Sequence, residues 1–181
     1  ADIDDIVDIL LKNKIVARAS GAMEFGARAL GNRSIFALPN NWENVDTIND
    51  IIKGRDFWMP FAGSVIDIDA DKVIDGDWRK ADPRFMTISF NTKETFYSKF
   101  KAATHRKDKT IRAQLVNYQD NPWYYSLLLK IREKTGIGVL LNTSFNIHGF
   151  PIVCNIEEGF NVFIKTGLEN VILGEYLLFK K

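Results

Sequence analysis

Hydrophobic residues recur at helical spacing in several stretches of the chain. In the first stretch, Ile3, Ile6 and Val7 lie three or four residues apart, as on one face of an amphipathic helix. Acidic residues open that stretch, and they suit the positive end of a helix dipole. The pattern at 123–134 is followed by Gly136, a residue type that commonly ends helices. The predicted helices cover residues 2–13, 43–53, 92–101, 123–134 and 156–165.

Short apolar or alternating runs between these helices predict β-strands. Several of the runs follow one another closely, without a helix between them. This order favours a mixed sheet with helices packed on it, an α/β fold of the mixed α+β type. Residues 69–82 are polar and rich in Asp, and we expect a surface loop there. The predicted strands cover residues 15–19, 34–38, 65–69, 85–90, 113–116, 139–142 and 151–153, with a terminal strand or pair of strands at 170–179.

The composition predicts one domain, spanning residues 1–181, with enough apolar material for its own core. Hydrophobic residues make up 46% of the chain, and no apolar run is long enough to predict a membrane span. The net charge is only +1, so nucleic acid is an unlikely partner and any anion site must be local. The single cysteine, Cys154, and an acidic start that does not resemble a signal peptide predict a cytoplasmic location.

The stretch from Gly21 to Ile35 has the most distinctive chemistry in the chain. Its glycines can adopt positive φ values or approach a ligand closely. Arg28 and Arg33 lie five residues apart, and a guanidinium group matches a phosphate or carboxylate with two parallel hydrogen bonds. The spacing is neither that of a P-loop nor that of a dinucleotide-binding loop. Two interpretations stay open here: an anion-binding loop, or a turn with two solvated arginines.

Two further clusters combine cations with strand or helix ends. Lys53 and Arg55 lie two residues apart at the end of a predicted helix and could contact neighbouring phosphate oxygens, although cations at a helix end can also be simply solvated. The basic stretch 104–114 reads mainly as a solvated loop. Arg112 is the exception, because it alternates with apolar residues at strand spacing and could point into a pocket.

A fourth cluster, Asn142–Asn146, follows a predicted apolar strand directly. Its short polar side chains and backbone N–H groups could hold phosphate oxygens or a ribose, or could satisfy one another in a turn. The two histidines do not have the spacing of a metal site, and we predict no metal-ligating side chains. We expect Cys154 to be a buried thiol in a strand rather than a nucleophile.

These four clusters, in this order, resemble the C-terminal domain of the nodulation-type O-carbamoyltransferases. The first motif matches from Gly21 to Ile35 except at Ala22 and Ala27, and the second matches from Ile48 to Ser64 with Gly63 in place of a proline. The third is recognisable between Thr104 and Gln114 with one inserted residue near Lys107. The fourth is intact from Asn142 to Val153. The resemblance covers nearly the whole chain.

The resemblance implies a YrdC-like fold and an ATP-dependent reaction. In this family the domain uses ATP and carbamoyl phosphate to make carbamoyl adenylate, with release of pyrophosphate. A separate N-terminal metal-binding domain of the same polypeptide then passes the carbamoyl group to a substrate hydroxyl. Mg²⁺ is expected to bridge the phosphates with few protein ligands. The present chain would therefore supply one part of a two-domain enzyme.

The residues matching the family motifs give a candidate site. The side chains expected to offset phosphate charge and stabilise the transition state are Arg28, Arg33, Lys53, Arg55 and Arg112. The side chains expected to position phosphate or ribose are Asn32, Ser34, Asn142, Thr143, Ser144 and Asn146.

Two other functions stay open at this point. One is a threonylcarbamoyl-adenylate synthase, although the long motif at Gly21 speaks against it. The other is a non-catalytic nucleotide- or RNA-binding module. In its favour, Ala22 replaces a family arginine, which removes a charged contact worth roughly 1.5–3 kcal/mol. The insertion near Lys107 could also alter activity.

Overall fold

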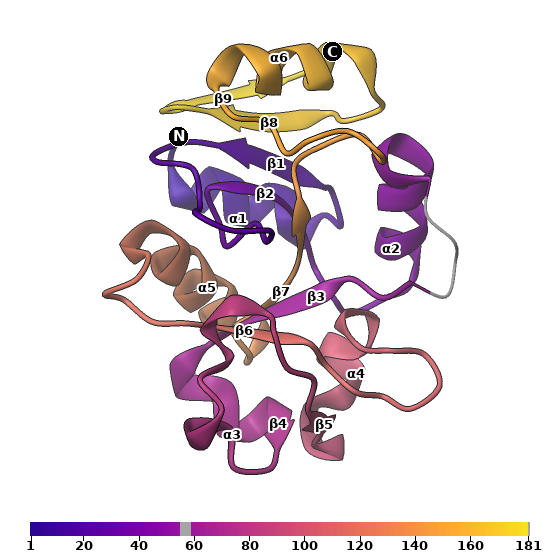
Figure 1. The fold of residues 1–181 in the computed structure, drawn as a ribbon, viewed down its shortest axis with the longest axis vertical. Coiled ribbons are helices and arrows are strands. Elements are labelled where there is room, and N and C mark those ends of the chain that lie inside the picture. The colour runs from indigo at the N-terminus through magenta and orange to yellow at the C-terminus, as the bar shows by residue number, and fades with distance from the viewer. Residues whose placement is uncertain (55–58, 181) are drawn as a thin grey trace.

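A seven-stranded mixed sheet forms the centre of the computed structural model, which describes residues 1–54 and 59–180 (Figure 1). The strand order is β6-β3-β7-β2-β1-β8-β9. The pairs β1–β8 and β3–β6 are parallel, and the other neighbours in this sheet are antiparallel. Strands β4 and β5 form a separate small sheet. The strands are β1 Val16–Ala19, β2 Arg33–Ala37, β3 Ala62–Ile66, β4 Ile74–Asp75, β5 Asn91–Thr92, β6 Ala113–Val116, β7 Val139–Ser144, β8 Asn170–Leu173 and β9 Tyr176–Phe179.

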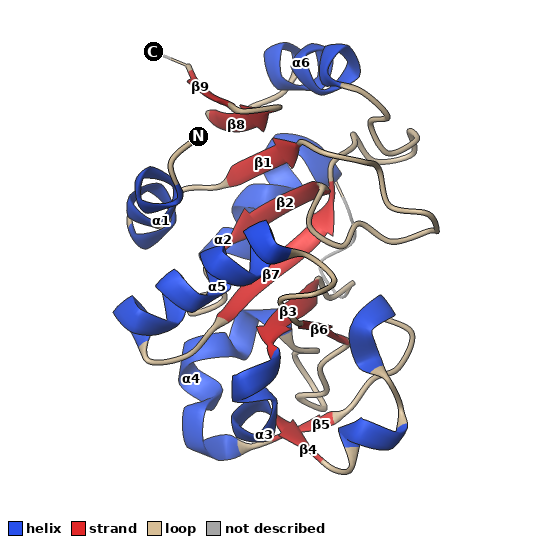
Figure 2. Ribbon diagram, turned by 90° about the vertical axis from the view of Figure 1, so that its left-hand side faces the viewer, coloured by secondary structure: helices blue, strands red, loops and turns tan. Residues whose placement is uncertain are grey.

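Helices pack on both faces of the main sheet. Helices α1 and α5 lie side by side on one face, and Figure 2 shows them next to the central strands. Residues of α2, α4 and α6 contribute to the core on the other face. A turn of π-helix, Asn49–Lys53, extends α2 and ends at Gly54 in the left-handed conformation. The α-helices are α1 Ile3–Leu11, α2 Glu43–Ile48, α3 Ala70–Val73, α4 Tyr97–Phe100, α5 Pro122–Thr135 and α6 Ile156–Lys165.

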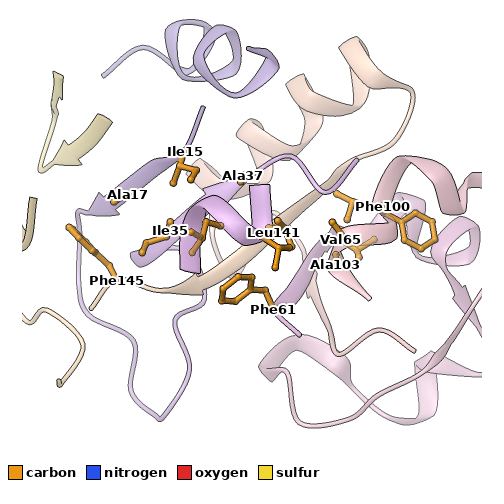
Figure 3. Close-up of a cluster of buried hydrophobic side chains, with 14 of the residues drawn as sticks. Ile15, Ala17, Ile35, Ala37, Phe61, Val65, Phe100, Ala103, Leu141 and Phe145 are labelled. Atoms are coloured by element: carbon orange, nitrogen blue, oxygen red, sulfur yellow. The ribbon is translucent and has the colours of Figure 1, made fainter. Parts of the chain in front are cut away.

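Both faces of the central strands are buried, and most residues in the middle of these strands are apolar. In β2, Ile35 belongs to one hydrophobic core and its neighbour Phe36 to the other. In β7, Leu141 and Leu140 divide in the same way. Figure 3 shows the first of these cores, with Ile35 and Leu141 among the labelled side chains. Alternate side chains of a strand point to opposite faces, which accounts for this division.

The sequence pattern located most elements correctly. Helix α6 begins and ends where it was predicted, and the side chain of Asn155 caps it by accepting a hydrogen bond from the N–H of Glu158. Gly136 ends α5 with a φ of 85°. The terminal run is a pair of strands, β8 and β9. Among the described residues, no helix combines the length and apolarity that crossing a membrane requires.

The strand predicted at residues 85–90 is wrong. Pro83–Phe85 forms a 3₁₀ turn, and Met86 adopts the left-handed conformation with a φ of 56°. A left-handed residue interrupts extended geometry at the start of the run, and residues 87–89 do not pair as a strand. Phe90 still pairs with Ile111 in an isolated bridge.

Four smaller predictions also need correction. Strand β3 runs from Ala62 to Ile66 and not over 65–69, and it ends at Ile66 because Asp67–Asp69 form a 3₁₀ turn. The expected loop at 69–82 contains α3 and β4. Residues 151–153 do not form a strand, although the N–H of Val153 donates to the carbonyl of Phe145. Cys154 is exposed rather than buried in the core.

Candidate functional site

Residues from all four sequence motifs line one cavity of about 50 Å³, which we call the central cavity. It lies beside the last residues of β7, next to the glycine-containing loop 20–32. A cavity of this size has room for a few water molecules or a small anion. The lining residues are Ala27, Arg28, Ala29, Phe61, Ala62, Met86, Arg112, Asn142, Thr143 and Ser144.

Two guanidinium groups bring positive charge to the central cavity. Arg28 is exposed, and it makes no hydrogen bond or ion pair with any residue that the structure describes. Arg112 is half-buried and reaches the cavity from the residue just before β6. Small polar groups of Thr143 and Ser144 share the lining. Because a guanidinium fork matches phosphate or carboxylate oxygens, this arrangement is suited to an anion.

A buried network of polar side chains holds the end of β7 against the loop. The Asn142 Nδ2 donates to Ser64 Oγ at 3.0 Å, to Gln114 Oε1 at 2.9 Å and to the carbonyl of Ala29 at 3.1 Å. The hydroxyl of Ser64 donates to Gln114 Oε1 at 2.6 Å. The Gln114 Nε2 donates to the carbonyl of Leu30 at 2.8 Å. Residues of β3, β6 and β7 thus fix the loop backbone at the edge of the cavity.

Lys53 joins the second motif to the fourth. Its side chain is completely buried, and its Nζ donates to the Ser144 carbonyl at 2.6 Å and to Asn146 Oδ1 at 2.7 Å. The Ser144 hydroxyl also donates to Asn146 Oδ1, at 2.6 Å. The lysine charge therefore lies directly behind the serine that lines the central cavity. Arg55, the second cation of this motif, lies outside the described residues.

A single carboxylate oxygen organises loop 20–32. Glu24 Oε1 accepts hydrogen bonds from the backbone N–H groups of Leu30 and Asn32, both at 2.7 Å, and of Arg33 at 3.3 Å. The hydroxyl of Ser34 accepts another loop N–H, that of Gly31, at 2.9 Å. These bonds satisfy the backbone of a segment that has no regular secondary structure.

Arg33 contributes its donors to the same loop. The Arg33 guanidinium donates to the carbonyls of Ser20 and Gly21 at 3.2 and 3.1 Å, and to the carbonyl of Cys154 at 2.8 Å from Nη2. Its side chain is buried, with 6% of the residue exposed. In this structure Arg33 therefore fastens the loop to the segment before α6 and does not line the central cavity.

Arg18 is a buried cation that the sequence interpretation missed. Its Nη1 donates to the Gly31 carbonyl at 2.8 Å and to Asn32 Oδ1 at 2.7 Å. Its guanidinium carbon lies 3.9 Å from the centre of the Trp123 ring, a cation–π contact. Burial lowers the pKa of Arg18 to about 10, so this side chain is still charged at neutral pH. Through its hydrogen bonds to Gly31 and Asn32, Arg18 holds the end of loop 20–32 against β1.

The predicted site residues thus fall into three groups. Five line the central cavity: Arg28, Arg112, Asn142, Thr143 and Ser144. Lys53 and Asn146 adjoin it through Ser144, whereas Asn32, Arg33 and Ser34 form the framework of the loop. The sequence did contain a signal for Arg18, because a charged residue inside the apolar strand β1 needs polar partners when it is buried.

Comparison with known proteins agrees with these motifs. Residues 7–180 match the family model described as "Carbamoyltransferase C-terminus". The uncharacterised protein MJ1051 of Methanocaldococcus jannaschii is 40% identical over 99% of this chain and 34% of its own length. The 3'-hydroxymethylcephem-O-carbamoyltransferase of Amycolatopsis lactamdurans is 31% identical over 95% of this chain and 32% of its own length. The chain therefore spans about a third of these relatives.

Solved structures confirm the YrdC-like fold. Full-length HypF, in a phosphate- and nucleotide-bound form, superposes with a TM-score of 0.64 at 17% identity, over 99% of this chain and 25% of HypF. Sua5 of P. abyssi, complexed with L-threonine, gives a TM-score of 0.62 at 16% identity, over 95% of this chain and 46% of Sua5. At such identities the likeness is one of fold. The family match over nearly the whole sequence goes further, and the chain belongs to the carbamoyltransferase C-terminus family.

Proposed function

We propose that this chain activates carbamoyl phosphate with ATP, forming carbamoyl adenylate for transfer to a substrate hydroxyl. The observation that carries the proposal is the central cavity, because four motifs that are far apart in the sequence meet there. The family match and the carbamoyltransferase among the relatives support the same chemistry.

The charges around the cavity suit a reaction between anions. Arg28 and Arg112 line it, and the ammonium group of Lys53 lies behind Ser144. Carbamoyl phosphate and ATP together bring several negative charges into one place. A desolvated hydrogen bond to a charged group contributes roughly 1.5–3 kcal/mol, so these cations could offset much of the repulsion.

The proposed reaction needs no covalent nucleophile. Water takes the phosphoryl group of carbamoyl phosphate, which leaves carbamate and inorganic phosphate. A carbamate oxygen then attacks the α-phosphorus of ATP, the bond from that phosphorus to the β-phosphate bridging oxygen breaks, and pyrophosphate leaves. Orientation and electrostatic stabilisation by Arg28, Arg112 and Lys53 would supply most of the catalysis.

The remaining predicted residues take supporting roles in this proposal. Thr143 would donate to phosphate oxygens from the cavity wall, and Ser144, whose hydroxyl donates to Asn146, would hold that wall in place together with Asn142 and Asn146. Asn32, Arg33 and Ser34 would keep the loop in the shape that presents Arg28. A role for Arg55 beside Lys53 stays a prediction.

The proposal includes Mg²⁺ bound together with ATP. Among the described residues there is no cluster of three or more His, Cys, Asp or Glu side chains that could hold a metal ion. We therefore propose that Mg²⁺ would be held mainly by phosphate oxygens and water, and that the ion would offset negative charge on the triphosphate. The chain's own contribution is the set of cations around the cavity.

The acceptor reaction is proposed to lie elsewhere in a longer polypeptide. The chain covers only about a third of the relatives it matches. We infer that an N-terminal metal-binding domain of the same polypeptide receives the carbamoyl adenylate and transfers its carbamoyl group. The net charge of +1 offers no general attraction for nucleic acid.

Pyrophosphate release tests the proposal directly. The chain, supplied with ATP and Mg²⁺, should release pyrophosphate when carbamoyl phosphate is added, and not when bicarbonate and threonine replace it. Arg112→Gln should lower the rate at least tenfold, whereas Arg79→Gln, an exposed arginine paired with Asp71, should not change it. ATP binding without pyrophosphate release would favour a non-catalytic module, and the absence of both would contradict the proposal.

A further inference from the structure

Strand β9, Tyr176–Phe179, forms an open edge of the main sheet. It is the last strand on its side, and among the described residues it pairs only with β8 (Figure 2). At the opposite edge of the sheet, the 3₁₀ turn Pro83–Phe85 lies against β6. Proteins usually protect a free strand edge with a charge, a proline or a bulge, but all four residues of β9 are aliphatic or aromatic. An edge of this kind favours pairing with another strand.

Leu177 and Phe179 direct their backbone groups away from β8. The N–H of Lys180 donates to the carbonyl of Glu169 at 2.9 Å, so these two residues form a hydrogen-bonded pair of the antiparallel ladder. Such pairs recur at every second residue, which assigns the backbone of Leu178 to β8 and that of its two neighbours to the open edge. An incoming strand therefore meets the N–H and C=O groups of Leu177 and Phe179.

Helix α6 carries an exposed apolar stripe. Three of its residues recur at every fourth position, so they lie along one line of the helix. They are Ile156, Phe160 and Ile164, and they are 54, 43 and 51% exposed. A helix face in contact with water normally carries polar residues. The stripe therefore indicates a surface that another protein covers.

The stripe lies on the β9 side of α6. The ring of the neighbouring Phe163 has its centre 4.9 Å from the Nζ of Lys180, which follows β9 directly. At the start of the stripe, Ile156 lies next to Gly174 in the turn between β8 and β9. The opposite side of α6 lines a groove against segment 147–153. Figure 1 shows α6 over β8 and β9, so stripe and strand form one surface. We call it the α6–β9 surface, and it consists of Ile156, Phe160, Ile164 and Tyr176–Phe179.

This surface supplies much of the area that a stable interface needs. Phe160, Tyr176 and Phe179 are 43, 76 and 65% exposed. At about 200 Å² for a whole aromatic side chain, their exposed parts contribute roughly 370 Å². A standard interface buries about 800 Å² on each partner, so these three rings provide nearly half of it. The stripe isoleucines and the strand backbone add to this area.

The α6–β9 surface is complementary to itself. A two-fold axis perpendicular to the sheet sets β9 antiparallel to β9 of a second copy. In the register that places Leu178 opposite its own copy, Leu177 lies opposite Phe179 of the second copy, and symmetry repeats this contact. The stripe is symmetric about Phe160, so antiparallel copies of α6 present the same residues to each other. A second copy therefore satisfies edge and stripe together, whereas an unlike partner would need both a free strand and a matching apolar helix.

We propose that the α6–β9 surface joins two copies of this chain into a dimer. Strand β9 pairs with its copy, the two seven-stranded sheets become one, and the two stripes face each other across the junction. Because the turn before Met86 lies against the β6 edge, the pair closes and does not grow into a fibre. The surface shares no residue with the lining of the central cavity, so this inference does not depend on the proposed function.

Sedimentation equilibrium measures the association. The chain has a mass of 20.7 kDa, and at roughly 100 μM we expect a species of twice this mass, because interfaces of standard size associate at micromolar concentrations or below. Phe160→Lys and Phe179→Lys should each raise the dissociation constant at least about tenfold, because each places a charge in an apolar interface. Tyr118→Lys, at another exposed aromatic residue outside this surface, should leave it unchanged.

Amide hydrogen exchange, followed residue by residue by NMR, tests the strand pairing in the wild-type chain. Exchange at Leu177 and Phe179 should slow at least about tenfold between dilute and concentrated solutions, because their N–H groups become bonded to the second copy. Exchange at Leu178 should change much less, since its N–H already belongs to the ladder with β8.

A chain that stays monomeric at this concentration overturns the proposal. A dimer whose dissociation constant neither charged substitution changes also overturns it, because another surface then holds the copies together. If the dimer forms but Leu177 and Phe179 gain no protection, β9 does not pair with its copy and the proposal fails. Protection confined to these two residues of β9 supports it, and that measurement holds even where a substituted chain does not fold.

Discussion

Buried charges are compensated in two different ways in this molecule. Beside the central cavity, Arg18 and Arg33 donate to carbonyl and amide oxygens, and neither forms an ion pair with a carboxylate among the described residues. Just before α3, the buried Asp69 instead pairs with Lys72 at 2.7 Å and with Arg132 of α5 at 3.0 Å. Carbonyl dipoles stabilise a cation without cancelling its charge, whereas an ion pair cancels it.

The comparison locates a surplus of positive charge at loop 20–32 and the central cavity. The loop region holds Arg18, Arg28 and Arg33 against the single carboxylate of Glu24. Asp69, Lys72 and Arg132, which we call the Asp69 cluster, show that the chain can match a buried charge with opposite charges. Positive charge that is solvated but not cancelled is what an anion site requires.

Removing Arg33 should produce the largest effect on stability. Arg33→Ala removes a buried guanidinium and leaves the carbonyls of Ser20, Gly21 and Cys154 without this donor, so we expect the free energy of unfolding to fall by about 3 kcal/mol. Urea unfolding measures this loss. Arg33→Lys keeps the charge but not the planar fork, and should recover only part of it. An unchanged stability in Arg33→Ala would show that the loop does not depend on these bonds.

Removing Arg28 should separate binding from folding. This side chain is exposed and makes no hydrogen bond to a described residue, so Arg28→Ala should change the free energy of unfolding by less than about 0.5 kcal/mol. The affinity for tripolyphosphate should nevertheless fall by one to two decades, because one charged contact is lost. Calorimetry and urea unfolding on the same variant check both halves. A variant that loses stability and affinity together would contradict the division of roles between Arg28 and Arg33.

Local signals in the sequence were sufficient for much of the fold. Strand β6 and helix α6 were predicted with their observed bounds, since alternation and helical periodicity are properties of neighbouring residues. The alternating run at 85–90 failed because alternation cannot show whether a partner strand is present. At that edge of β6 the chain instead turns through a left-handed Met86.

The sequence motifs predicted which residues belong to the site, but not which of them line the cavity and which support the loop. The motif at Gly21 contains two arginines that are equivalent in sequence terms. Which one reaches the cavity depends on a carbonyl at Cys154, 121 residues away from Arg33, and no local pattern contains that contact. Arg18 was missed for a similar reason, because its partners belong to a loop that closes over it only in the folded chain.

The Asp69 cluster provides the smallest test, and it depends on pH. Burial alone would raise the pKa of Asp69, but hydrogen bonds from Lys72, from the N–H of Gly138 and from Arg132 outweigh it, so its pKa lies below the ordinary value of 3.8. A carboxyl group with a lowered folded-state pKa stabilises the fold above its unfolded-state pKa. That contribution is lost as the pH falls through the lower, folded-state value.

The stability advantage of the wild type over Asp69→Asn should therefore be constant above about pH 5 and shrink as the pH falls below 3.8, while the cost of Arg33→Ala stays the same, because carbonyl groups do not titrate. Urea unfolding between pH 6 and pH 2 measures both differences, with Asp8→Asn as an exposed carboxylate control. A pH-dependent cost of Arg33→Ala would mean that a carboxylate, and not carbonyl dipoles, compensates that guanidinium. The loop would then be neutralised like the Asp69 cluster, and the surplus of positive charge beside the cavity would disappear.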